Sequence, residues 1–184
     1  MATSAVTLHL YPDHTGRSRQ ARLFKAAADF AAALGCPCPD LTLAQGEFGK
    51  PYFPASPWLH FSISHSGGYW LLGLSLTALG LDIQEKRPAD YLALARRWFK
   101  PAEAANVAQG GAEAFYEVWC AREAYLKLIG CGLSQADKAE SLVRDGQLCH
   151  CLGSAALLFP CLVSGYAACV AGEIGPLDII RHDV

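Results

Sequence analysis

The spacing of apolar residues along the chain predicts several helices. Apolar side chains recur every three to four positions in four segments, which is the helical period. These segments are Ser18–Leu34, Tyr91–Phe99, Pro101 to about Val107, and Ala112–Ile129. Glycines bound them, because a glycine ends a helix at little conformational cost. Gly35 follows the first segment, Gly110 and Gly111 precede the last, and Gly130 closes it.

Short apolar runs between turn residues predict strands. The runs are Trp58–Ile63, Tyr69–Leu76, Leu79–Ile83, Leu142–Arg144, Leu148–Leu152, Leu157–Val163 and Tyr166–Ala171. Ser64–Gly68 is predicted as a turn, and Asp145-Gly146 and Ser164-Gly165 as hairpin turns. The stretch Cys36–Pro57 is rich in proline and glycine and predicts a loop with short extended pieces. This layout of helix plus sheet, twice over, indicates an α+β fold with two similar halves.

Composition narrows the class of protein. The 184 residues are 52% hydrophobic and 17% charged, which excludes intrinsic disorder. The apolar runs fall well short of the ~20 residues that span a bilayer, and Met1–Leu10 does not have the pattern of a secretory signal. With 15 basic and 17 acidic residues, the chain lacks the basic excess of a nucleic-acid binder. We therefore expect a cytoplasmic protein that binds neither nucleic acid nor membrane.

Eight cysteines allow two interpretations. In a long apolar chain without a secretory signal, reduced thiols that serve as small packing residues are expected. A zinc site is the alternative. Its weakness is the spacing, because Cys36 and Cys38, like Cys149 and Cys151, are separated by one residue, whereas structural zinc sites favour gaps of two to four.

A carboxylate lies among apolar residues in the predicted strand that contains Asp82. Side chains alternate along a strand, so Asp82 and Gln84 share one face and Glu85 points to the other. A carboxylate at such a strand end is a natural ligand for a hard metal ion. The alternative is an ordinary aspartate that caps a turn.

Three further groups are each ambiguous alone. Glu123 and Lys127 are four residues apart on a predicted helix, so they form either a surface ion pair worth ~0.2–0.5 kcal/mol or a pair that faces a phosphate and its metal. Ser64 and His65 lie either in an anion-binding turn or in an ordinary polar turn. Lys50 is presented by a turn after Gly49 and says little by itself.

Taken together and in order, these stretches resemble a known family. The stretches are Gly49–Pro51, Ser62–Gly67, Gly80–Ile83, and Trp119–Lys127 with the following Gly130 and Gly132. They are similar to the motifs of the 4′-phosphopantetheinyl transferase superfamily, and within it to the larger Sfp (surfactin synthetase activator) type. The resemblance implies an α+β pseudo-dimer of two similar halves, residues 1–90 and 91–184. Each half would have a small antiparallel sheet and a long helix, with the active site in the cleft between them.

The resemblance also implies a reaction and its participants. Such enzymes move 4′-phosphopantetheine from coenzyme A to a serine of an apo acyl or peptidyl carrier protein, and release 3′,5′-ADP. Asp82 and Glu123 match the acids that bind Mg²⁺, and Gln84 stands where a third ligand is usual. Glu123 is also the expected base for the serine proton, and Lys127 the expected phosphate contact.

The remaining family positions concern coenzyme A. Ser64 and His65 match the loop that touches the nucleotide and phosphates, and Lys50 matches the lysine beside the adenine. Arg22 or Lys25 falls where the first helix supplies a cation, which we expect to serve the 3′-phosphate. The resemblance to this type also implies that the chain acts as a monomer.

Three departures from the family pattern qualify the resemblance. Ser62 replaces the usual asparagine, Arg122 replaces a lysine, and Gln84 replaces an acid and so removes one charge from the metal site. The loss at Gln84 favours one alternative, a non-catalytic relative that binds coenzyme A or a carrier protein. A magnesium-dependent phosphatase or nuclease is another. For docking an acidic carrier protein, the candidates are Arg96, Arg97 and Lys100.

Overall fold

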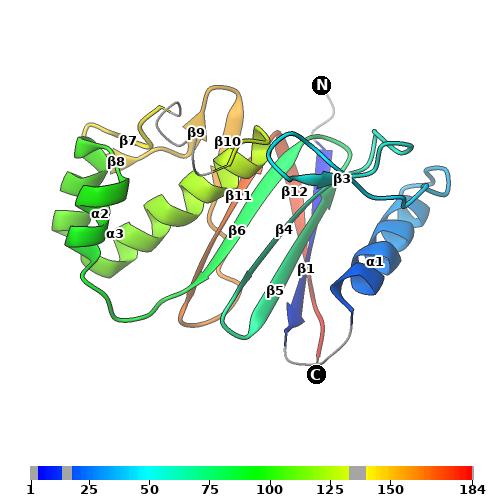
Figure 1. The fold of residues 1–184 in the computed structure, drawn as a ribbon, viewed down its shortest axis with the longest axis horizontal. Coiled ribbons are helices and arrows are strands. Elements are labelled where there is room, and N and C mark those ends of the chain that lie inside the picture. The colour runs from blue at the N-terminus through cyan, green and yellow to red at the C-terminus, as the bar shows by residue number, and fades with distance from the viewer. Residues whose placement is uncertain (1–3, 14–17, 133–139, 184) are drawn as a thin grey trace.

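A computed structural model of the chain describes residues 4–13, 18–132 and 140–183, and in these ranges it forms two four-stranded sheets with helices on their outer sides (Figure 1). The first sheet contains, in spatial order, β12 (Ile174–Arg181), β1 (Ser4–Pro12), β5 (Tyr69–Ser75) and β4 (His60–Ser66). The second contains β6 (Leu79–Glu85), β11 (Tyr166–Gly172), β10 (Ala155–Leu158) and β9 (Cys151–Leu152). Two small hairpins pair β2 (Ala44–Gln45) with β3 (Pro51–Tyr52) and β7 (Val143–Arg144) with β8 (Gln147–Leu148).

Three helices lie where the apolar spacing predicts them. They are α1 (Arg19–Ala33), α2 (Tyr91–Trp98) and α3 (Pro101–Leu128). The predicted break at Gly111 is confirmed as a kink within α3, since this glycine has φ 62° and ψ −138°. α1 lies beside the first sheet, and α2 and α3 lie at the opposite end of the molecule (Figure 1). None of these described helices is long and apolar enough to cross a membrane.

The buried apolar side chains of the described residues form three clusters between successive layers. Phe30 of α1 packs with Phe61 and Trp70 of the first sheet. Leu8 of β1 and Leu81 of β6 belong to a second cluster, between the two sheets. The third cluster joins α3 to the second sheet and to α2. The layers therefore hold β6 between the first sheet and α3, so that its side chains reach both.

Two strands of the first sheet are absent from the sequence-based prediction. β1 pairs with β5 in antiparallel orientation, and it pairs in parallel with β12, so that Leu8 lies opposite both Gly73 and Ile179. β12 contains Gly175 and Pro176, which weaken a strand signal, but proline is tolerated there because β12 is an edge strand. The parallel pair also corrects the expectation of a purely antiparallel sheet in each half.

Two predicted turns and two predicted strands differ from the structure. The expected strand Leu148–Leu152 is divided, because β8 ends at Leu148 and Cys151–Leu152 forms β9 of the second sheet. β4 continues through Ser66, so the expected turn from Ser64 is confined to Gly67 and Gly68. The expected strand Leu157–Val163 is wrong, because β10 ends at Leu158 and an irregular segment, 159–165, leads to β11. Ser164-Gly165 is consequently not a two-residue hairpin. Asp145-Gly146 is one, with φ values of 51° and 76° that match a type I′ turn.

The mixed α+β class is confirmed, but the strands do not separate at residue 90. β6 belongs to the second sheet, where Asp82 pairs with Cys169, and β12 from the end of the chain belongs to the first. The division into halves 1–90 and 91–184 stays a prediction. The strand membership nevertheless means that each sheet needs residues from both sides of that boundary.

Candidate active site

The candidate site is centred on the carboxylate of Asp82, which is 5% exposed on β6. Its Oδ1 atom accepts hydrogen bonds from the hydroxyl of Ser64 at 2.6 Å and from Nζ of Lys127 at 2.8 Å. Its Oδ2 atom is buried and has no hydrogen-bond partner among the described residues. A buried carboxylate oxygen without a donor is costly, so this atom is poised to accept a cation.

A glycine allows β6 to approach α3 this closely. A Cβ atom on Gly80 would overlap the carbonyl oxygen of Ala124 and the backbone nitrogen of Leu128. Both partners are backbone of α3, which cannot move aside as a flexible side chain would. The glycine two residues before Asp82 thus brings this acid within reach of Lys127 on the facing helix.

Glu123 supplies the second carboxylate, one turn before Lys127 on α3. Burial raises the pKa of Glu123, and the nearby Asp82 carboxylate raises it further, whereas Lys127 lowers it. The influence of Asp82 indicates that the two acids lie near each other. Lys127 contacts Asp82, so this pair of α3 residues faces β6; the roles of Glu123 and Lys127 as site residues stay a prediction.

This donor set fits a magnesium ion. Mg²⁺ takes oxygen ligands, usually one or two carboxylates, and retains several waters. Asp82 offers an oxygen without a donor, and Glu123 is a second carboxylate whose pKa is raised mainly by burial and further by the nearby Asp82 charge. Gln84 lies on the same face of β6 as Asp82 and is half-buried. Its role as a third ligand stays a prediction.

A cavity of about 330 Å³ adjoins the two charged side chains of α3. Its lining includes Phe48, Lys50, Ser62, Glu123, Lys127 and Cys131. Lys50 donates a hydrogen bond from Nζ to the Leu79 carbonyl oxygen at 3.0 Å, and burial lowers its pKa to about 8. The structure thus brings the lysine of the Gly49–Pro51 stretch to the same cavity as the two charged residues of α3.

His65 lies on the opposite face of β4 from Ser64, where its side chain is exposed. It is close enough to Asp13 to help lower the pKa of that acid, although the hydrogen bond from Arg19 is the larger cause. Because Ser64 and His65 are neighbours in a strand and not residues of a turn, their side chains point to opposite faces of β4; their contact with the nucleotide and phosphates stays a prediction.

The two predicted cations of α1 lie apart from Asp82. Arg22 donates to the Pro12 carbonyl oxygen at 3.1 Å, and its guanidinium lies 4.9 Å from the centre of the Tyr11 ring. Lys25 is exposed and forms an ion pair with Asp29 at 2.7 Å. Arg22 also contributes to the lowered pKa of Asp13, as His65 does, so Arg22 and His65 lie at the same end of the first sheet.

The side chain of Arg122, the residue before Glu123, points into the core. Its side chain is 5% exposed and forms an ion pair with Glu103, which is fully buried near the start of α3. The pair lies in the core, so Arg122 adds no cation to the cavity. Glu103 is absent from the sequence-based site; its carboxylate accepts a hydrogen bond from the Lys100 N–H at the start of α3 at 2.8 Å.

Cys120 and Cys169 are buried neighbours of Asp82 that sequence reasoning assigned only to packing. Burial is the main cause that raises the pKa of each thiol, and Asp82 adds to it. Both thiols therefore stay protonated in the core beside Asp82. All eight cysteines are free, and the described residues contain no group of three or more His, Cys, Asp or Glu that could hold a metal ion.

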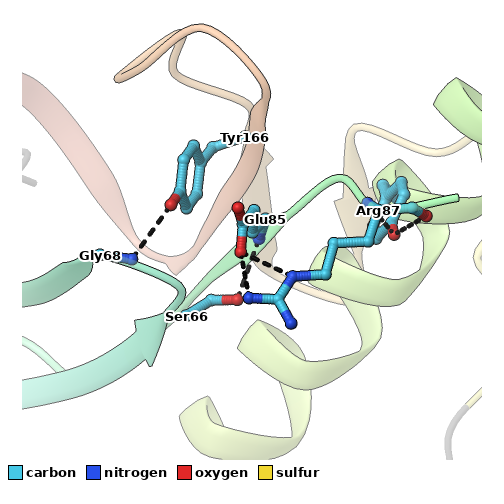
Figure 2. Close-up of polar contacts among 6 residues, drawn as sticks. Ser66, Gly68, Glu85, Arg87 and Tyr166 are labelled. Atoms are coloured by element: carbon cyan, nitrogen blue, oxygen red, sulfur yellow. Dashed lines mark hydrogen bonds and ion pairs between the residues drawn. The ribbon is translucent and has the colours of Figure 1, made fainter.

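Glu85 takes part in a separate polar cluster (Figure 2). Its carboxylate accepts a hydrogen bond from Nε of Arg87 at 2.7 Å, and its backbone N–H donates to the Ser66 hydroxyl at 3.0 Å. Tyr166 accepts from the Gly68 N–H at 3.2 Å. Glu85 is therefore committed to this cluster and cannot replace Gln84 beside Asp82, as the alternation of the strand predicts.

Comparison with known proteins relates the chain to one family. The model of the 4′-phosphopantetheinyl transferase superfamily matches residues 78–153, which include Asp82, Glu123 and Lys127. The chain is 34% identical over 116 residues to a 4′-phosphopantetheinyl transferase of Bacillus subtilis, which covers 61% of this chain and 50% of that protein. It is 30% identical over 154 residues to 4′-phosphopantetheinyl transferase Sfp of Bacillus subtilis strain 168, which covers 76% of this chain and 67% of the relative.

The chain is also 32% identical over 101 residues to 4′-phosphopantetheinyl transferase HetI of Nostoc. This match covers 50% of this chain and 43% of that protein. The chain belongs to the 4′-phosphopantetheinyl transferase superfamily. Its matches to named transferases of Bacillus include the Sfp protein itself. The chain spans about half the length of the first of these curated relatives.

Proposed function

We propose that this chain transfers 4′-phosphopantetheine from coenzyme A to a serine hydroxyl of an apo acyl or peptidyl carrier protein. The serine oxygen forms a bond to the phosphorus that carries pantetheine, and the bond from that phosphorus to the 3′,5′-ADP oxygen breaks. The observation that carries the proposal is the hydrogen bond between Lys127 and Asp82, with Glu123 close enough to Asp82 for its pKa to respond. Glu123 and Lys127 also line a cavity. Family membership supports it.

In this proposal Asp82 and Glu123 hold a magnesium ion, with Gln84 or water as a further ligand. When bound, Mg²⁺ neutralises pyrophosphate charge as the phosphorus–oxygen bond breaks. Glu123 accepts the proton of the attacking serine, a role suited to a carboxylate with a raised pKa. Lys127 donates to phosphate oxygens and balances the negative charge of the leaving group.

The nucleotide part of coenzyme A would lie along the first sheet. Lys50, in the cavity, is proposed to contact the adenine, and His65 with Arg22 to contact the 3′-phosphate. Lys25 is the weaker choice because it is paired with Asp29. In this proposal the ligand would lie in the cleft between the two halves that the family resemblance implies.

The partner is proposed to be an acidic carrier protein. Arg96 and Arg97 are exposed at the end of α2 and Lys100 follows them half-buried, which makes this region the candidate docking surface. The proposal includes action as a monomer in the cytoplasm, on coenzyme A and carrier protein alone.

The test is a panel of apo-carrier proteins incubated with coenzyme A and Mg²⁺ and analysed by mass spectrometry. A gain of one phosphopantetheine is expected. Asp82→Asn and Glu123→Gln should each reduce the rate by more than the ~10²–10³-fold typical of one lost electrostatic contact, because the metal site is lost. Asp29→Asn, on the exposed pair of α1, is the matched control and should retain the wild-type rate.

Two results would contradict the proposal. Coenzyme A binding without mass gain on any carrier would favour the non-catalytic relative, for which neutral Gln84 is the one supporting feature. Cleavage of coenzyme A in the absence of a carrier would indicate a hydrolase.

A further inference from the structure

Serine hydroxyls join the two sheets where β4 runs beside β6. These strands belong to different sheets and share no backbone ladder. Ser62 accepts a hydrogen bond from the Leu81 N–H at 3.1 Å, and Ser66 accepts one from the Glu85 N–H at 3.0 Å. Residues at every second position of a strand share a face, so these hydroxyls stand in for the missing backbone contacts.

Ser64 lies between these two serines but makes a different contact. Its hydroxyl donates to Oδ1 of Asp82 at 2.6 Å. Ser64 is 8% exposed and Asp82 5%, so water cannot readily supply a replacement donor. A short, charge-assisted hydrogen bond of this kind is among the stronger ones in proteins, and it restrains the rotation of the carboxylate.

The other donor to Oδ1 is less suited to hold the carboxylate still. Lys127 carries a long side chain that is 27% exposed. Ser64 has a single rotatable bond, and its backbone is paired with β5, opposite Leu71. The hydroxyl therefore restrains Oδ1 even when the Lys127 side chain moves away. Oδ2 then stays the oxygen without a donor.

We propose that Ser64 is a positioning residue that orients the Asp82 carboxylate for Mg²⁺, and that its hydroxyl is not a phosphate ligand. The inference rests on the proposed function for the identity of the metal. It replaces the phosphate contact expected from the sequence, because the Ser64 side chain points toward β6 and away from the face that carries His65. Such supporting hydrogen bonds typically change metal affinity by ~10–100-fold when they are removed.

The experiment measures Mg²⁺ binding by titration calorimetry on the full chain, with and without coenzyme A. Ser64→Ala should weaken Mg²⁺ binding by roughly 10–100-fold, and Ser64→Thr, which keeps the hydroxyl, should restore most of it. Ser66→Ala is the matched control, since it removes a hydrogen bond between the same strands at Glu85 without touching Asp82. Its Mg²⁺ affinity should stay near the wild-type value.

A second arm measures coenzyme A binding in EDTA. Ser64→Ala should bind coenzyme A as the wild type does, because the hydroxyl does not touch phosphate; weaker binding in EDTA would overturn the inference. So would equal Mg²⁺ affinities for Ser64→Ala and Ser66→Ala, or a wild-type chain that binds no Mg²⁺ in either condition. Failure of the proposed function would instead appear as absent transfer to every carrier while this difference in Mg²⁺ affinity remained.

Discussion

Replacement of Glu103 by glutamine tests whether the buried ion pair behind the site stabilises the fold. Glu103 is fully buried. Its Oε1 accepts a hydrogen bond from the Leu142 N–H at 2.9 Å. Its Oε2 accepts one from the Lys100 N–H at 2.8 Å and forms the ion pair with Arg122. Glu103→Gln preserves the shape but leaves the Arg122 charge in the core without its carboxylate. Breaking one side of a buried pair costs about 3–5 kcal/mol. At about 2–4 °C per kcal/mol for a chain of this size, the melting temperature should fall by roughly 6–20 °C.

The free energy of unfolding is measured by urea titration with far-ultraviolet circular dichroism, and the melting temperature by heating the same samples. Glu140→Gln is the matched control, because it breaks a pair with Arg144 that is exposed on both sides and worth ~0–1 kcal/mol. Adding Arg122→Met to Glu103→Gln should recover part of the loss, since the uncompensated charge is then removed. A loss for Glu103→Gln no larger than that of the control would refute the reasoning.

Three further predictions concern the metal site and pH. Lys127→Gln should bind Mg²⁺ more tightly than wild type without coenzyme A, because a cation leaves Asp82; calorimetry that shows no gain would contradict this. Gln84→Glu should lower the Mg²⁺ concentration for half-maximal transfer, and an unchanged midpoint would show that Gln84 does not face the metal. Burial, and then His182, lower the pKa of His9 to about 4. As the pH falls, His9 therefore takes up a proton in the unfolded chain at a higher pH than in the folded chain. The free energy of unfolding consequently decreases by up to about 3 kcal/mol between pH 6.5 and pH 4. His9→Gln should flatten that part of the urea-unfolding profile, and an unaltered slope would count against it.

Features that depend on neighbouring residues were predictable from the sequence. The helical period places Glu123 and Lys127 on one side of α3, and the alternation of a strand separates Asp82 from Glu85. Asp145-Gly146 forms its predicted turn because both residues tolerate positive φ. In each case the physical preference is set within a few residues, so the order of residues along the chain is enough.

Other features were decided by the tertiary structure. Nothing local indicates that β12 pairs in parallel with β1 across more than 160 residues, or that Arg122 turns into the core toward Glu103. The same holds for Ser64, whose position in the sequence is equally typical of a turn that binds an anion. The identity of its partner depends on the packing of β4 beside β6, and of β6 against α3. A short segment predicts the direction of its side chains relative to its own backbone, whereas only the packed layers determine which distant groups those side chains meet.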